Sequence, residues 1–217
     1  MATVSARARL DFGRIIMVPA AAAMLVFDVM ALTHGGRSGG AAAAVRWPGA
    51  ALVCAFYALI IWCYLRRSRA VATSGSVTGY AAAVTATLIP FTLPLLRGAP
   101  RGAGQEYAGY LLVVAGTGWA VWSVRFLGRS ISVIAQAREV VDRGPYRLVR
   151  HPLYAGELVS ALGVAVVVGT PWALCVWVAL CALQAYRALR EEQVLLQALP
   201  GYRSYQARTA ALVPGVF

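Results

Sequence analysis

Long apolar runs alternate with short polar or glycine-rich segments along most of this chain. A helix that spans a membrane needs about 20 apolar residues. Four runs have roughly that length, and they cover residues 15–33, 48–65, 77–96 and 107–127. The pattern therefore predicts four membrane helices before the first long polar segment.

A fifth apolar region, residues 152–189, is too long for a single crossing. A Gly-Thr-Pro sequence divides it, because Thr170 can cap a helix and Pro171 suits the first turn of the next one. We therefore expect a helical hairpin whose first arm is 152–168. Its second arm runs past the membrane into an amphipathic tail, residues 190–217. Full and partial crossing of the hairpin remain open alternatives.

Composition adds the class of protein. Of the 217 residues, 60% are hydrophobic and 13% are charged, whereas soluble proteins are about a quarter charged. The mean hydropathy is +0.67. These values predict an all-α integral membrane protein with about six membrane helices, four plus the C-terminal hairpin.

The net charge is +12, and all twenty basic residues are arginine. Sixteen of them flank one side of the predicted bundle: Arg7, Arg9, Arg14, Arg66, Arg67, Arg69, Arg125, Arg129, Arg138, Arg143, Arg147, Arg150, Arg187, Arg190, Arg203 and Arg208. The other four are Arg37, Arg46, Arg97 and Arg101. Because cytoplasmic loops are enriched in arginine, both termini and segment 128–151 are predicted to be cytoplasmic. We expect membrane lipids as partners and no nucleic acid, and the composition favours the inner membrane of a bacterium.

Few reactive or charged side chains lie inside the apolar runs. Cys54, Cys63, Cys175 and Cys181 form no CxxC pair, so neither a disulfide nor a metal site is predicted. Asp28 lies in the middle of the first run, where a carboxylate needs a partner. Proton handling, substrate polarity and a buried structural hydrogen bond all stay open for it.

The densest polar cluster is GPYRLVRHPLYAG, from Gly144 to Gly156. Ionisable groups at a membrane boundary are functional candidates. Pro152 favours a helix start directly after His151, which puts Tyr154 and Gly156 in the first turn. The free N–H groups there suit a carboxylate, and a glycine lets a ligand approach the backbone.

The second arm of the hairpin carries its own charged cluster, RALREE. Arg187 and Glu191 are four residues apart and share a helix face, with Glu192 beside them. A pair of carboxylates can hold an ammonium group or a ribose diol. The two clusters together predict a site for a ligand with both charges at the cytoplasmic mouth of the hairpin.

The order GPYR-x-x-RHP-x-Y-x-G, apolar hairpin, R-x-x-x-E-E and Y-x-x-Y before a final proline resembles the isoprenylcysteine carboxyl methyltransferase family. That family belongs to a wider group that includes phospholipid N-methyltransferases, and the resemblance covers about residues 130–217. It implies an integral membrane enzyme that uses S-adenosylmethionine. Residues implied to surround the cofactor are Tyr146, Arg150, His151, Tyr154, Gly156, Glu191 and Glu192.

By the same resemblance, Arg187 lies near the reacting substrate group, and Tyr202, Tyr205 and Arg208 shape the tail that closes the site over the substrate. The family often has a phenylalanine shortly before the tyrosine pair, where this chain has Leu-Pro-Gly. The first four helices match no motif. We therefore expect residues 1–127 to form a substrate tunnel and residues 128–217 to form the catalytic, cofactor-binding region.

Methyl transfer from a sulfonium is an in-line displacement, and we expect a lipidic or prenylated acceptor that carries a carboxylate. Such an acceptor is already ionised, so it needs alignment and an arginine clamp, for which Arg187 is the candidate. An amine acceptor would instead need a base, such as Glu191, Glu192 or His151. Arg187 and Glu191 are therefore the candidate catalytic residues.

Two other classes compete with this interpretation. A sterol-type NADPH-dependent reductase uses a similar C-terminal scaffold, but GPYR and the Arg187, Glu191 and Glu192 pattern favour the methyltransferase. A non-catalytic transporter or assembly factor leaves the 144–156 cluster unexplained. The identity of the acceptor and the oligomeric state do not follow from the sequence.

Overall fold

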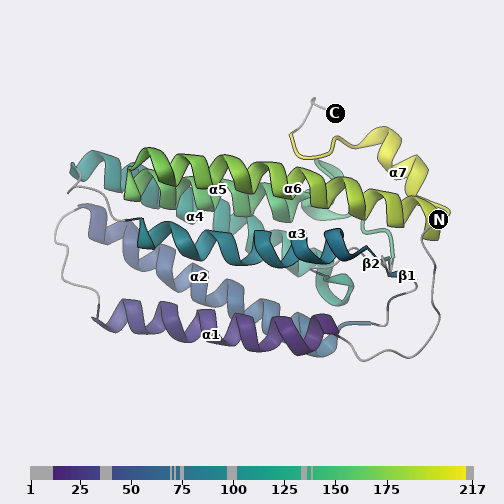
Figure 1. Cartoon of the computed structure of the whole chain (residues 1–217), viewed down its shortest axis with the longest axis horizontal. Helices are drawn as coiled ribbons and strands as arrows, with labels where there is room; N and C mark the ends of the chain where they lie inside the picture. Colours follow the sequence, from purple (N-terminus) through teal and green to yellow (C-terminus); the bar gives the residue numbers. More distant parts are fainter. Residues whose placement is uncertain are drawn as a thin grey trace.

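The computed structural model describes residues 12–34, 41–68, 70, 72–73, 76–96, 102–132, 136–137 and 139–213. In this part of the chain, long helices lie side by side along one axis (Figure 1). They are α1 (Phe12–His34), α2 (Ala41–Arg66), α3 (Val77–Leu88), α4 (Ala103–Leu127), α5 (Pro152–Val168) and α6 (Pro171–Ala198). The short helix α7 (Tyr202–Arg208) follows. The helical class predicted from the sequence is confirmed.

Short elements complete the fold. Three 3-10 helices are η1 (Ile89–Leu95), η2 (Gly128–Ser130) and η3 (Gly144–Arg147). Two-residue strands, β1 (Ala72–Thr73) and β2 (Gln136–Ala137), pair antiparallel. This small pair ties the segment before α3 to the loop before η3.

Each predicted apolar run forms a helix, but the third differs from the prediction. The α-helical part ends at Leu88, and η1 continues it as a 3-10 helix to Leu95. Pro90 and Pro94 both lack an N–H to donate to the preceding turn, and two such gaps four residues apart disfavour the α-helical ladder. A single proline is accommodated inside α1 (Pro19) and α2 (Pro48). The prediction of one continuous helix over 77–96 was therefore wrong in its second half.

Among the described residues, three helices are long and apolar enough to cross a membrane, and they are Ala44–Arg66, Ala103–Leu127 and Pro171–Ala198. The apolar stretches of α1, α3 and α5 are shorter. The 17 residues of α5 extend for about 26 Å, slightly less than a hydrocarbon core of about 30 Å. An integral membrane protein is supported, whereas six full crossings are not confirmed.

The start of α1, the end of α2, the β pair and α7 lie at the same end of the bundle (Figure 1). Alternating helix directions bring the 139–151 segment to that end as well. The predicted common side for these segments is therefore present in the fold. Several residues of the earlier argument lie outside the described residues: Arg7, Arg9, Arg37, Arg69, Arg97, Arg101, Arg138 and the side chains of Asp28 and Arg129.

The hairpin between α5 and α6 forms as its turn residues predict. Gly169 ends α5 with a left-handed φ of 64°, which glycine adopts without a steric penalty. Thr170 then caps α6, because its side-chain oxygen accepts a hydrogen bond from the N–H of Ala173 at 3.2 Å. Pro171 occupies the first turn of α6. These local interactions place the two charged clusters on adjacent helices.

Helix α4 packs on α5 through glycines, and Gly156 is one of them. A Cβ at Gly156 would lie 2.7 Å from the carbonyl oxygen of Gly116, and a Cβ at Gly116 would lie 2.6 Å from the oxygen of Gly156. Gly109 and Gly163 form a second contact of this kind. Close backbone approach is how small residues join helices in membranes. Gly156 therefore faces α4 and packs against it, and its contact with a ligand stays a prediction.

Replacing Gly156 with alanine should destabilise the protein by about 1–3 kcal/mol, because the added methyl group overpacks the contact between α4 and α5. Thermal unfolding in detergent measures the change. Gly104→Ala is the matched control, since a Cβ at Gly104 would meet nothing within 4 Å. Equal melting temperatures for the two variants would contradict the packing role.

Candidate functional site

Glu192 of α6 joins three separate segments through its buried carboxylate. Arg150 donates from Nε to Oε1 at 2.7 Å, and His151 Nε2 lies 3.0 Å from the same oxygen. Gln206 of α7 donates from Nε2 to Oε2 at 2.8 Å. One side chain therefore ties α6 both to the start of α5 and to the C-terminal tail.

Arg150 holds the tail in place with its backbone and its side chain. Its N–H donates to the carbonyl of Ala210 at 2.8 Å, and the N–H of His151 donates to Ala211 at 3.0 Å. The Arg150 guanidinium also donates to the carbonyls of Gln206 and Thr209. The charge of Arg150 is thus engaged in fixing the chain around the site.

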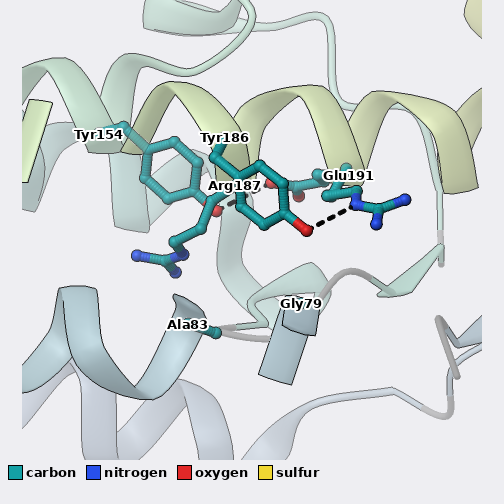
Figure 2. A pocket seen from close by; sticks show the side chains of 7 residues that line it. Gly79, Ala83, Tyr154, Tyr186, Arg187 and Glu191 are labelled. Carbon is teal, nitrogen blue, oxygen red and sulfur yellow. Dashed lines mark hydrogen bonds between the residues drawn. The ribbon is translucent and has the colours of Figure 1, made fainter. Parts of the chain in front are cut away.

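Tyr154 links the two charged clusters (Figure 2). Its ring stacks on His151 with centroids 5.4 Å apart, and the Cζ of Arg187 lies 4.7 Å from the Tyr154 centroid. Its hydroxyl donates to Oε2 of Glu191 at 3.0 Å. His151 Nδ1 lies 3.8 Å from that same oxygen. Residues from α5 and α6 are therefore locked into one polar unit.

Two hollows meet at Glu191. The larger, which we call the tyrosine cleft, encloses about 470 Å³ including its open mouth and is lined in part by Tyr146, His151, Tyr202, Tyr205 and Glu191. The smaller, the arginine pocket, encloses about 260 Å³ on the same measure. It is lined by Gly79, Ala83, Tyr154, Tyr186, Arg187, Arg190 and Glu191 (Figure 2). Glu191 alone among these residues lines both.

The hydroxyl groups of the tyrosine cleft stay protonated. Burial raises the pKa of Tyr146 well above its usual value, and nearby Glu191 raises it further. Burial likewise raises the pKa values of Tyr202 and Tyr205. Tyr205 uses its proton to donate to the carbonyl of Tyr146 at 2.7 Å. The cleft wall therefore carries neutral rings and hydrogen-bond donors at neutral pH.

The structure divides the site residues predicted from the sequence between the two hollows, and this division differs from the grouping that the resemblance implies. Tyr202 and Tyr205 line the tyrosine cleft with His151, not the arginine pocket that contains Arg187. Arg208 lines neither hollow. Glu192 also lines neither, because its carboxylate is turned to Arg150, His151 and Gln206.

Arg208→Ala should leave turnover within about twofold of wild type, because an exposed ion pair contributes at most about 1 kcal/mol. Arg208 is 58% exposed and pairs with Asp142 at 3.0 Å, and that carboxylate is also half-exposed. Turnover measured in detergent and in lipid checks this. A large loss of activity would instead support the placement of Arg208 in the substrate site.

Sequence reasoning missed two polar side chains next to the site. Gln184 donates from Nε2 to Glu157 Oε2 at 2.7 Å, and Arg187 donates from Nη1 to Gln184 Oε1 at 2.8 Å. The available signal was a polar residue within each apolar arm of the hairpin, which is expensive in a membrane. Glu157 also directly follows the polar cluster in sequence.

A family model described as Phospholipid methyltransferase matches residues 105–200. The match spans most of α4, the segment with Tyr146 and His151, and both arms of the hairpin. It leaves out α1 to α3 and the tyrosines of α7. No curated protein matches the chain significantly. Residues 105–200 are therefore similar to the phospholipid methyltransferase family, within the group of membrane methyltransferases that resemble isoprenylcysteine carboxyl methyltransferase.

Proposed function

We propose that this protein transfers a methyl group from S-adenosylmethionine to a lipidic acceptor that carries a carboxylate. The observation that carries the proposal is the meeting of the tyrosine cleft and the arginine pocket at Glu191. Transfer between two ligands requires that their reacting ends meet in fixed geometry. Two differently lined hollows that share one wall residue provide such an arrangement.

The tyrosine cleft suits the cofactor in the chemistry of its lining. The rings of Tyr146, Tyr202 and Tyr205 can stack on an adenine and attract a cation. Glu191 and His151 add polar groups at the end shared with the arginine pocket. When bound, the cofactor supplies an electrophilic methyl group on its sulfonium.

The arginine pocket suits an anionic acceptor. Arg187 is buried, with 7% of its surface exposed, and its planar guanidinium can hold a carboxylate through two hydrogen bonds. A carboxylate with a pKa of about 4 is ionised at neutral pH, so no base is required. Gly79 and Ala83 leave room along α3, where we propose that the lipid tail or prenyl group enters from the bilayer.

Phospholipid N-methylation is the second candidate, and the description of the matching family favours it. In that reaction Glu191 would accept a proton from the amine. Arg190, which also lines the arginine pocket, would then hold the phosphate. The family match favours methyl transfer of either kind over NADPH-dependent reduction.

The setting of the reaction is also part of the proposal. All six long helices cross or enter a bacterial inner membrane, and the end with α7 faces the cytoplasm. The soluble cofactor then arrives from the cytoplasm, while the acceptor arrives from the lipid. Residues 1–127 would shape the access route for the acceptor, and the reaction requires no nucleic acid.

The test uses the full chain in lipid nanodiscs with S-adenosylmethionine labelled in its methyl group. A prenylated cysteine analogue and a long-chain fatty acid serve as carboxylate acceptors, and phosphatidylethanolamine serves as the amine acceptor. We expect label in a lipid product that mild base releases as methanol, because an ester hydrolyses and an N-methyl group does not. Base-stable label found only in phosphatidylethanolamine would establish the second candidate instead.

A further inference from the structure

Three side chains form a polar chain between α5 and α6 beside the arginine pocket. Glu157 of α5 accepts from Gln184 at 2.7 Å, and Gln184 accepts from Arg187 at 2.8 Å. Gln184 is 1% exposed. The carboxylate of Glu157 therefore reaches Arg187 through one buried amide.

We infer that Glu157 and Gln184 are positioning residues, which act through Arg187 by fixing its guanidinium in the arginine pocket. The inference rests on the proposed function for the consequence in catalysis, but the geometry itself does not. Neither residue belongs to the set that the sequence pattern identified. Both are placed by the helices that also carry Tyr154 and Arg187.

The chemistry of the three groups fixes the orientation of Gln184. An ionised carboxylate only accepts hydrogen bonds, and a guanidinium only donates them. With its nitrogen toward Glu157 and its oxygen toward Arg187, the amide satisfies both neighbours. A flipped amide would place an acceptor against an acceptor and donors against donors. Glu157 thus locks Gln184, and Gln184 in turn locks Arg187.

The hydrogen-bonded side chains of Glu157 and Gln184 also offset the buried charge of Arg187. A buried cation is costly unless an anion and hydrogen bonds compensate it. Glu157 and Glu191 are the carboxyl groups close enough to act on this charge, and the face of the Tyr154 ring lies 4.7 Å from the Cζ of Arg187. The guanidinium is therefore held in place before any acceptor enters the pocket.

A purely structural tie between α5 and α6 is the competing explanation. It predicts that removing either residue lowers the melting temperature without a selective effect on Arg187. Positioning predicts a loss of turnover without a matching loss of cofactor affinity. It also predicts a change in the chemical reactivity of Arg187 that needs no activity at all.

The experiment compares Glu157→Leu and Gln184→Leu with Glu157→Gln, in which an oxygen remains to accept from Gln184. Gln105→Leu is the matched control. It removes an amide that donates to Val166 of α5 at 2.8 Å, near the opposite end of that helix from Glu157. Each full-length variant is purified in nanodiscs, and its melting temperature is recorded first.

Two readouts follow for each variant. The first is kcat and KM for methyl transfer, together with calorimetric affinity for S-adenosylmethionine. The second is the rate at which phenylglyoxal modifies Arg187, measured by mass spectrometry of the peptide. Arg190 in the same peptide is the internal control, because its guanidinium donates to Tyr186 and Gln193.

We expect both leucine variants to lose roughly 10- to 100-fold in kcat, as displaced catalytic groups do, with cofactor affinity retained. Arg187 should react several-fold faster with phenylglyoxal, while Arg190 stays unchanged. Gln105→Leu should resemble wild type in both readouts. Glu157→Gln, which keeps the acceptor oxygen but loses the charge, should fall between wild type and Glu157→Leu.

Unchanged reactivity of Arg187 in both leucine variants would overturn the inference. Equal behaviour of Glu157→Gln and Glu157→Leu would also overturn it, because the hydrogen bond could not then be the cause. If the wild-type protein neither binds S-adenosylmethionine nor transfers methyl groups, the proposed function fails by itself. The reactivity of Arg187 still decides the positioning role in that case.

Discussion

Arg187→Ala should lower turnover by roughly 10²- to 10³-fold, the usual loss when a charge-stabilising donor is removed from an active site. Affinity for S-adenosylmethionine should stay close to wild type, because Arg187 lines the arginine pocket and not the tyrosine cleft. The physical reason is that the acceptor loses the guanidinium that binds its carboxylate, whereas the residues that line the cofactor site are unchanged. Single-turnover methyl transfer and calorimetry on the same preparation measure the two effects.

Arg187→Lys sharpens this prediction, since lysine keeps the charge but lacks the planar fork of donors. It should fall between wild type and Arg187→Ala in turnover. An equal loss of cofactor affinity and turnover in the alanine variant would contradict the assignment. Arg187 would then belong to the cofactor side of the site.

Glu192→Ala should destabilise the protein by about 3–5 kcal/mol, as breaking a buried ion pair from one side does. Arg150, His151 and Gln206 would all lose their shared acceptor. The tail that carries α7 should loosen, because Arg150 also holds the carbonyls of Gln206 and Thr209. Thermal unfolding and limited proteolysis of residues 202–213 measure the change.

Glu191→Ala is the matched control at the neighbouring position. Its side chain is 25% exposed, and it accepts a hydrogen bond from the hydroxyl of Tyr154. We expect a small change in melting temperature but a loss of cofactor binding. The opposite pattern, with Glu191→Ala unfolded and Glu192→Ala stable, would contradict both assignments. Glu191 would then be the structural residue and Glu192 the cofactor-binding one.

The sequence predicts the hairpin well because its signals are local. Thr170 caps the helix that Pro171 begins, so a few adjacent residues determine the turn. The third helix shows the limit of this reasoning. Its apolar composition suggests one helix, whereas the segment with Pro90 and Pro94 is a 3-10 helix in the structure.

The sequence named most of the residues that the structure brings together around Glu191, but it did not predict their separate contacts. Glu191 and Glu192 are adjacent in sequence and chemically identical. Hydrogen bonds from Arg150 and His151, which are distant in sequence, and from Gln206 of α7 make Glu192 the anchor. Gly156 is a similar case, because its packing partner Gly116 lies on another helix.

The most direct test of the central claim is calorimetric binding of S-adenosylmethionine to the purified protein, with Glu191→Ala as the control and NADPH as the competing ligand. The account predicts binding of S-adenosylmethionine to the wild type, loss of that binding in Glu191→Ala, and no binding of NADPH. Binding of NADPH in its place, or equal binding of S-adenosylmethionine to wild type and variant, would contradict it.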